Sequence, residues 1–184
     1  MKHAVVVAAL LCLSACINVD DFGPYWNRAS VDRRLIGDWK LVPASPDQTR
    51  GKGYGIGDVL RIAIKADAYE LTSFDDAGKQ LDAPQTARTL AVGTYRFLAS
   101  GPTRGMMAPY RLDGRTLYMC HQLGPAMVDF IEAHYPNAVN IGKNRGEGSY
   151  IVIKQFDDEV FQALASVPDT NSYWDCDRKF ERVR

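Results

Sequence analysis

Along most of the chain beyond Asp32, hydrophobic residues alternate with polar ones. Leu60, Ile62 and Ile64 would lie on one face of an extended strand. Arg61, which interrupts them, would lie on the opposite face. Successive side chains of a β-strand point to opposite faces of its sheet, so a period of two is typical of strands with one buried face. The alternation therefore predicts a mainly β, antiparallel fold.

The alternating stretches predict about eight strands in an up-and-down order, a number that suits a small closed barrel. They lie near residues 37, 58, 68, 90, 109, 115, 150 and 178. The stretch 90–98 is predicted as a single strand, whose inward row would be Ala91, Gly93, Tyr95 and Phe97. Asp113-Gly114 predicts a tight hairpin, because both residues tolerate positive φ.

Two segments follow a helical spacing instead. Pro125 fits the first turn of a helix that ends before Pro136, with Met127 and Ile131 on one face. Residues 160–167 repeat hydrophobic side chains at the spacing of a second short helix. We therefore expect one or two short helices inserted in the barrel, within a single domain that covers 31–184.

In the first predicted strand, Gly37 and Trp39 form a Gly-x-Trp element that resembles the start of lipocalin-like barrels. The resemblance implies that these two residues close one end of the barrel, with the tryptophan as the plug. It also implies that an arginine of the last strand stacks over the tryptophan, and Arg178, Arg182 and Arg184 are the candidates. A second motif of the family is not recognisable. The alternative is that Trp39 is an ordinary core aromatic on a strand.

The N-terminus has the layout of an export signal, with basic Lys2 before an apolar run, Ala4–Leu13. The run is too short for a membrane-spanning helix, which needs about 20 residues. Leu13-Ser14-Ala15-Cys16 resembles the lipobox of bacterial lipoproteins, in which the cysteine thiol receives a lipid before the signal is cut away. The resemblance implies a signal peptide at 1–15 and lipidation of Cys16. The alternative is an ordinary secretory cleavage site.

The segment 16–30 has little periodic pattern and is predicted as a lipidated tether, with order beginning near Val31. Ile17 follows the lipobox cysteine, whereas lipoproteins that enteric bacteria keep in the inner membrane have an aspartate at that place. We therefore expect a protein of the cell envelope that is attached to the outer membrane by its lipid and faces the periplasm.

Two cysteines remain after Cys12 leaves with the signal and Cys16 takes the lipid. An even pair in an oxidising compartment predicts a disulfide between Cys120 and Cys176. By the chain-entropy estimate, closing a loop of about 56 residues stabilises a fold by on the order of 4 kcal/mol. The alternative is two separate buried thiols.

Other motifs give little support for chemistry. The chain has 22 basic and 22 acidic side chains, without the basic surplus of nucleic-acid binders. The glycine-rich segments 50–57 and 142–148 lack the order of a phosphate loop, which leads into a helix. Cys120 with His121 and His134 would suit a nucleophile or a metal site, but an oxidised cysteine and wide histidine spacing argue against both. No common hydrolase motif occurs, and the sequence predicts no metal and no cofactor.

Three functions remain, in descending order of preference. The first is a non-enzymatic module that contacts another envelope protein or has a structural role. The second is a carrier of a small apolar ligand, which the lipocalin resemblance implies, and the third is an enzyme of unrecognised type. A cavity lined by Leu60, Ile62, Tyr95 and Phe97 would favour the carrier, whereas an interior filled by these side chains would favour the first function. We expect a filled interior.

Overall fold

The computed structural model describes residues 17–43, 56–144 and 150–183. The predicted signal peptide, Cys16, Arg184 and most of the two glycine-rich segments lie outside the described residues. The described part is mainly β, and its sheet is dominated by antiparallel pairs, as the alternation predicts.

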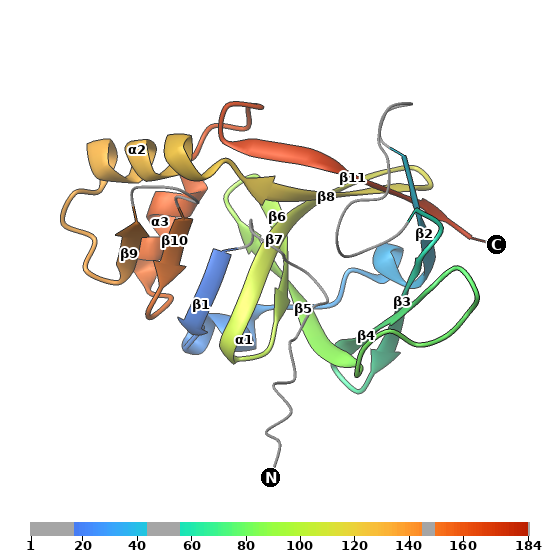
Figure 1. The fold of residues 1–184 in the computed structure, drawn as a ribbon. Helices are drawn as coiled ribbons and strands as arrows, with labels where there is room; N and C mark the ends of the chain where they lie inside the picture. Colours follow the sequence, from blue (N-terminus) through green and yellow to red (C-terminus); the bar gives the residue numbers. More distant parts are fainter. Residues whose placement is uncertain (1–16, 44–55, 145–149, 184) are drawn as a thin grey trace, which may run out of the picture.

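Eight strands form a closed ring (Figure 1). They are β2 (Gly37–Val42), β3 (Val59–Lys65), β4 (Ala68–Phe74), β5 (Gln85–Val92), β6 (Tyr95–Ser100), β7 (Thr103–Asp113), β8 (Thr116–Gln122) and β11 (Trp174–Arg182). Neighbours in the ring pair antiparallel, and their order follows the chain, which confirms the predicted up-and-down arrangement. The predicted hairpin near Asp113 joins β7 to β8, with its two-residue turn at Gly114 and Arg115.

A second group of elements lies beside the ring and comes between β8 and β11 in the chain (Figure 1). It contains α2 (Gly124–His134), β9 (Ile141–Asn144), β10 (Tyr150–Ile153) and α3 (Asp158–Ala165). Pro125 lies in the first turn of α2, and Asp157 caps α3 by accepting a hydrogen bond from the Val160 N–H. Both predicted helices are therefore present, whereas the predicted strand near 150 is β10 and lies outside the ring. None of the described helices has the length and apolar composition that crossing a membrane requires.

The prediction of a tether at 16–30 is wrong for residues 17–30, which belong to the fold. β1 (Ile17–Asp21) pairs antiparallel with β7 and parallel with β10, so it joins the second group to the ring in one sheet. Two short elements follow, α1 (Pro24–Arg28) and the 3-10 helix η1 (Arg33–Leu35). Ile17 and Val19 are each only 1% exposed. A five-residue strand with two buried positions is too short to give a recognisable pattern in the sequence.

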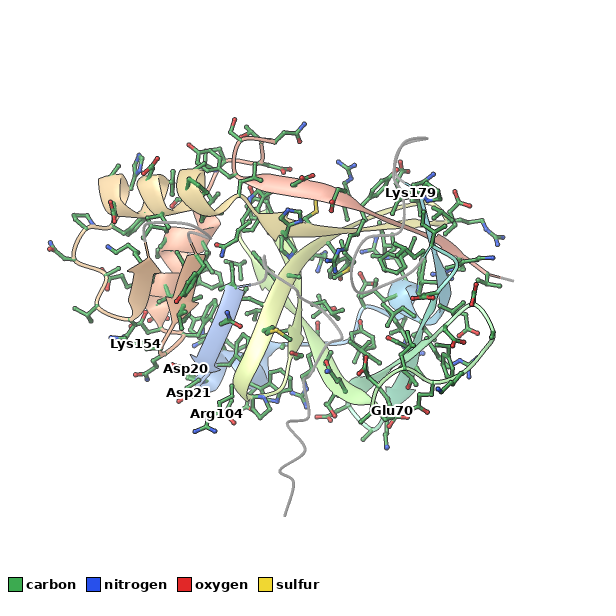
Figure 2. All side chains as sticks on the ribbon, viewed as in Figure 1. Asp20, Asp21, Glu70, Arg104, Lys154 and Lys179 are labelled. Carbon is green, nitrogen blue, oxygen red and sulfur yellow. A yellow bond between two sulfur atoms is a disulfide. The ribbon has the colours of Figure 1, made fainter. Side chains whose placement is uncertain are left out.

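Asp20 and Asp21 lie where β1 ends at the surface. Figure 2 shows them close to Arg104 and Lys154 at this edge of the molecule. The strand register explains this arrangement, because Asp21 pairs with Thr103 on β7 and Val19 pairs with Ile153 on β10. The acidic pair therefore marks the end of a strand.

The prediction of one strand over 90–98 is also wrong. β5 ends at Val92, which pairs with Tyr95 at the start of β6, so Gly93 and Thr94 form a two-residue turn. Gly93 has φ 57°, a backbone conformation that favours glycine. A Cβ at this position would lie 2.9 Å from the backbone oxygen of Ala165 in α3. The turn therefore packs closely on α3, a long-range contact that the local sequence does not reveal.

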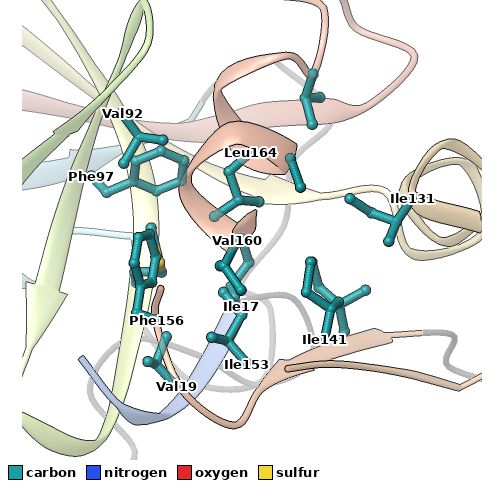
Figure 3. Close-up of a cluster of buried hydrophobic side chains, with 14 of the residues drawn as sticks. Ile17, Val19, Val92, Phe97, Ile131, Ile141, Ile153, Phe156, Val160 and Leu164 are labelled. Carbon is teal, nitrogen blue, oxygen red and sulfur yellow. The ribbon is translucent and has the colours of Figure 1, made fainter. Parts of the chain in front are cut away.

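Two hydrophobic clusters lie on the two sides of the ring wall. The inner cluster takes at least one side chain from every ring strand and, with Leu35, contains Trp39, Leu60, Ile62, Tyr69, Leu71, Ala87, Leu98, Ala108, Tyr110, Leu117, Met119 and Phe180. The outer cluster lies between the ring wall and the second group, and it includes side chains of β1, β6, α2, β10 and α3 (Figure 3). The sheet is therefore covered on both faces where the second group packs.

The four predicted ligand-lining residues are divided between these clusters. Leu60 and Ile62 belong to the inner cluster, whereas Tyr95 and Phe97 belong to the outer one. On β6 the neighbouring Leu98 points into the ring, so Phe97 must point out of it. The four side chains therefore do not face one interior, as a single ligand cavity lined by all of them would require.

Candidate functional site

One end of the ring is organised around Trp39. This side chain is completely buried and donates through Nε1 to the Leu35 oxygen at 2.7 Å. The Arg182 guanidinium lies over the indole, with its Cζ 4.5 Å from the ring centroid, and donates to the Arg34 oxygen. Gly37 has φ 142°, within the region that favours glycine. Of the candidate arginines, Arg182 is the one that the structure places over Trp39, where it ties β11 to η1.

A polar network lies beside this end, among side chains that are far apart in the sequence. The Tyr69 hydroxyl donates to the backbone oxygen of Asp32 at 2.9 Å and accepts from the backbone N–H of the same residue. Thr89 Oγ1 lies 3.2 Å from the Tyr69 hydroxyl and 3.3 Å from the Tyr110 hydroxyl. The Tyr110 hydroxyl also donates to the Asp32 carboxylate at 3.3 Å. The network therefore connects β4, β5 and β7 to the segment that precedes η1.

Arg34 keeps the Asp32 carboxylate of this network ionised. Its Nε and Nη2 lie 2.9 Å and 2.7 Å from the two Asp32 oxygens, and this hydrogen bonding lowers the pKa of Asp32 despite partial burial. Burial raises the pKa of Tyr69 and of Tyr110, because an ionised phenol is poorly solvated there. At neutral pH Asp32 is therefore an anion, and the two tyrosines are neutral hydrogen-bond donors.

A cleft opens next to the network, because β7 extends farther than β6. The two strands pair as far as Arg96 and Tyr110, and β7 continues to Asp113 without β6 beside it. The resulting cleft, which we call the notch, has a volume of about 320 Å³. Its lining includes Arg34, Arg96, Arg111, Tyr95, Tyr110 and Trp174. The disulfide forms another part of the lining.

That disulfide joins Cys120 on β8 to Cys176 on β11, which confirms the predicted pair. It lies at an irregularity in the pairing of the two strands, between Asp175 and Arg178. Oxidation leaves Cys120 without the thiol that a nucleophile requires.

The two histidines have separate environments. His121 lies 3.8 Å from a carboxylate oxygen of Asp175 and 3.5 Å from one of Asp177. His134 instead stacks on Phe130 in α2, with the two ring centroids 4.3 Å apart. Within residues 17–43, 56–144 and 150–183, no group of three or more histidine, cysteine, aspartate or glutamate side chains could hold a metal ion.

Sequence reasoning missed most of the residues of this site. Asp32, Arg34 and Tyr110 show no motif, and Arg96 looks like the polar position of an alternating strand. Their shared location depends on ring closure, which brings β6 and β7 to the segment before β2. The only local signal is the position of Asp32-Arg33-Arg34 just before the Gly-x-Trp element. No protein-family model, curated protein or solved structure matches the chain.

Proposed function

We propose that this chain is a lipoprotein of the bacterial cell envelope, anchored through Cys16 in the outer membrane and facing the periplasm, where it acts as a non-enzymatic protein-interaction module. The lipobox at residues 13–16 supports the anchor. The Cys120–Cys176 disulfide supports an oxidising compartment, since such bonds persist in the periplasm and are rare in the cytosol. Two or more acyl chains would hold the protein stably on the membrane.

The domain is proposed to be a lipocalin-like barrel. Its support is the closed ring, together with the placement of Gly37, Trp39 and Arg182 at one end. These are the positions at which the resemblance implies a barrel-closing tryptophan and an arginine stacked over it. The inner cluster occupies the ring interior with large side chains such as Trp39, Tyr69 and Tyr110, which favours the interaction module over a carrier of an apolar ligand.

One observation carries the interaction role: within the described residues, the sheet has a free edge at β9. The ring strands pair on both sides, and the strands that extend the sheet are β1, β10 and then β9 at its end. An unpaired strand edge offers backbone donors and acceptors to a partner strand. Val139, just before β9, is 74% exposed, and Tyr150 at the start of β10 is 41% exposed. This edge therefore combines free backbone groups with exposed hydrophobic side chains.

A photo-crosslinking amino acid at Val139 tests the interaction role in intact cells. We expect one discrete crosslinked envelope protein from this position and none from the same amino acid at Ala77, an exposed turn residue on the ring. Replacing Lys143 in β9 by proline should weaken the crosslink. The Lys154 N–H donates to the Asn140 oxygen, so the alternation of an antiparallel pair directs the Lys143 N–H away from β10, and proline has no such donor. Equal crosslinking from Val139 and Ala77, or none from Val139, would contradict the proposal.

The anchor is tested separately by Cys16→Ser, with Cys12→Ser as the matched control. The Cys16 variant should remain unprocessed or leave the membrane fraction, whereas the control should be processed and retained. Recovery of the Cys16 variant in the detergent phase at the mature size would refute the lipid anchor. A mass increase of the wild-type protein that corresponds to one diacylglyceryl group would support the lipid anchor.

A further inference from the structure

We propose that the notch between β6 and β7 binds a small organic oxyanion, a carboxylate or a phosphate monoester with a compact apolar body. The site does not depend on the lipid anchor or on the free edge at β9. Its volume of about 320 Å³ lies at the lower end of the range typical of small-molecule sites.

Positive side chains come from both faces of the sheet at the notch. Arg96 pairs with Tyr110, a residue of the inner cluster, so its side chain lies on the ring-interior side. Arg111 follows Tyr110 on β7 and therefore points to the other side, where its Cζ lies 4.8 Å from the Tyr118 ring centroid. Both arginines line the notch, so it receives a basic residue from each face of the sheet. Guanidinium groups bind carboxylate and phosphate oxygens through charge-assisted hydrogen bonds.

The balance of charges in the lining is positive. Arg34 forms an ion pair with Asp32. Asp169 is the one carboxylate among the residues that line the notch. In the part of the chain that the structure describes, neither Arg96 nor Arg111 forms an ion pair with a carboxylate. These two arginines therefore retain the capacity to bind an oxyanion.

The remaining walls suit an apolar body attached to the charged group. Tyr95 and Trp174 lie with their ring centroids 5.3 Å apart, and both line the notch. The Tyr95 hydroxyl donates to the Val167 oxygen at 2.9 Å, which fixes this wall against the segment after α3. Leu112 adds a further apolar surface. A ring or a short hydrocarbon chain would bury against these side chains while its oxyanion meets the arginines.

Isothermal titration of the purified protein with phenyl phosphate, benzoate and uncharged benzyl alcohol tests this site. We expect saturable one-to-one binding of the two anions and none of the alcohol. Arg96→Gln and Arg111→Gln should each weaken anion binding about tenfold, the loss of one charge-assisted hydrogen bond. Arg33→Gln is the matched control, because Arg33 is exposed and does not line the notch, and it should change the affinity less than about twofold.

Two outcomes would overturn the proposal. One is the absence of saturable binding of either anion to a wild-type protein whose circular dichroism and melting temperature show it to be folded. The other is an equal loss in Arg33→Gln, which would show a general charge effect instead of a site. If inorganic phosphate bound as tightly as phenyl phosphate, the role of Tyr95 and Trp174 as an apolar wall would be refuted.

Discussion

Replacing Gly93 by alanine would introduce two destabilising effects at the β5–β6 turn, and a matched control can separate them. The first is backbone strain, because Gly93 has φ 57° and an L-residue there costs about 1–2 kcal/mol. The second is a clash, because the new Cβ would lie 2.9 Å from the Ala165 oxygen and 3.0 Å from the Ala165 Cα. Both contacts are with backbone atoms, which cannot rotate away, and such overpacking costs about 1–3 kcal/mol.

Gly114→Ala is a matched control, because Gly114 also lies in a two-residue hairpin turn. Its φ of 55° is nearly the same as that of Gly93, and a Cβ at Gly114 would meet nothing within 4 Å. The control therefore carries the backbone strain without the clash. We expect Gly93→Ala to lower the free energy of unfolding by about 1–3 kcal/mol more than Gly114→Ala.

Thermal unfolding followed by circular dichroism measures this difference. For a chain of this size, 1 kcal/mol corresponds to about 2–4 °C, so the Gly93 variant should melt about 2–12 °C below the Gly114 variant. Equal melting temperatures would refute the close packing of the β5–β6 turn on α3.

Three further predictions concern the disulfide, the stacked arginine and the buried carboxylate. Cys120→Ser together with Cys176→Ser should lower the free energy of unfolding by on the order of 4 kcal/mol in denaturant titration, and a loss below about 1 kcal/mol would contradict the chain-entropy account. Arg182→Gln should lower stability by about 1–2 kcal/mol and change the fluorescence of Trp39, whereas an unchanged emission spectrum would argue against the stacked arrangement. The lowered pKa of Asp32 means that its contribution to stability is present above its ordinary pKa of 3.8 and is lost as the pH falls through the folded value. Asp32→Asn should therefore make unfolding less dependent on pH below about pH 4, and an unchanged acid profile would oppose the Asp32–Arg34 pairing.

The parts of the fold that the sequence predicts are those encoded by neighbouring residues. Alternation at Leu60 and Ile62, the hairpin near Asp113 and the helical spacing after Pro125 all correspond to elements of the structure. The predicted number of barrel strands, about eight, matches the number in the ring, but two errors in the assignment of strands cancel. A missed hairpin at Gly93 is offset by β10, which was predicted as a barrel strand and lies outside the ring.

The candidate site could not be predicted in the same way, because tertiary pairing creates it. Arg96 and Arg111 come together through the β6–β7 register, and Trp174 joins them after the whole second group has intervened in the chain. The Trp39 end is different, because Gly37 and Trp39 lie two residues apart on one strand and form a recognisable element. The identity of the stacking arginine still required the structure, since the register of β11 against β2 selects Arg182.

The position of β1 in the sheet has a consequence for the order in which the chain folds. Synthesis proceeds from the N-terminus, so Ile17–Asp21 is made before both of its partners. Ile17 pairs with Met107, and Asn18 pairs with Val152, so each contact must close a long loop of chain. Closing long loops costs chain entropy before the contacts repay it, and it slows folding. β1 is made before the other described strands, but it can enter the sheet only after β7 has been made.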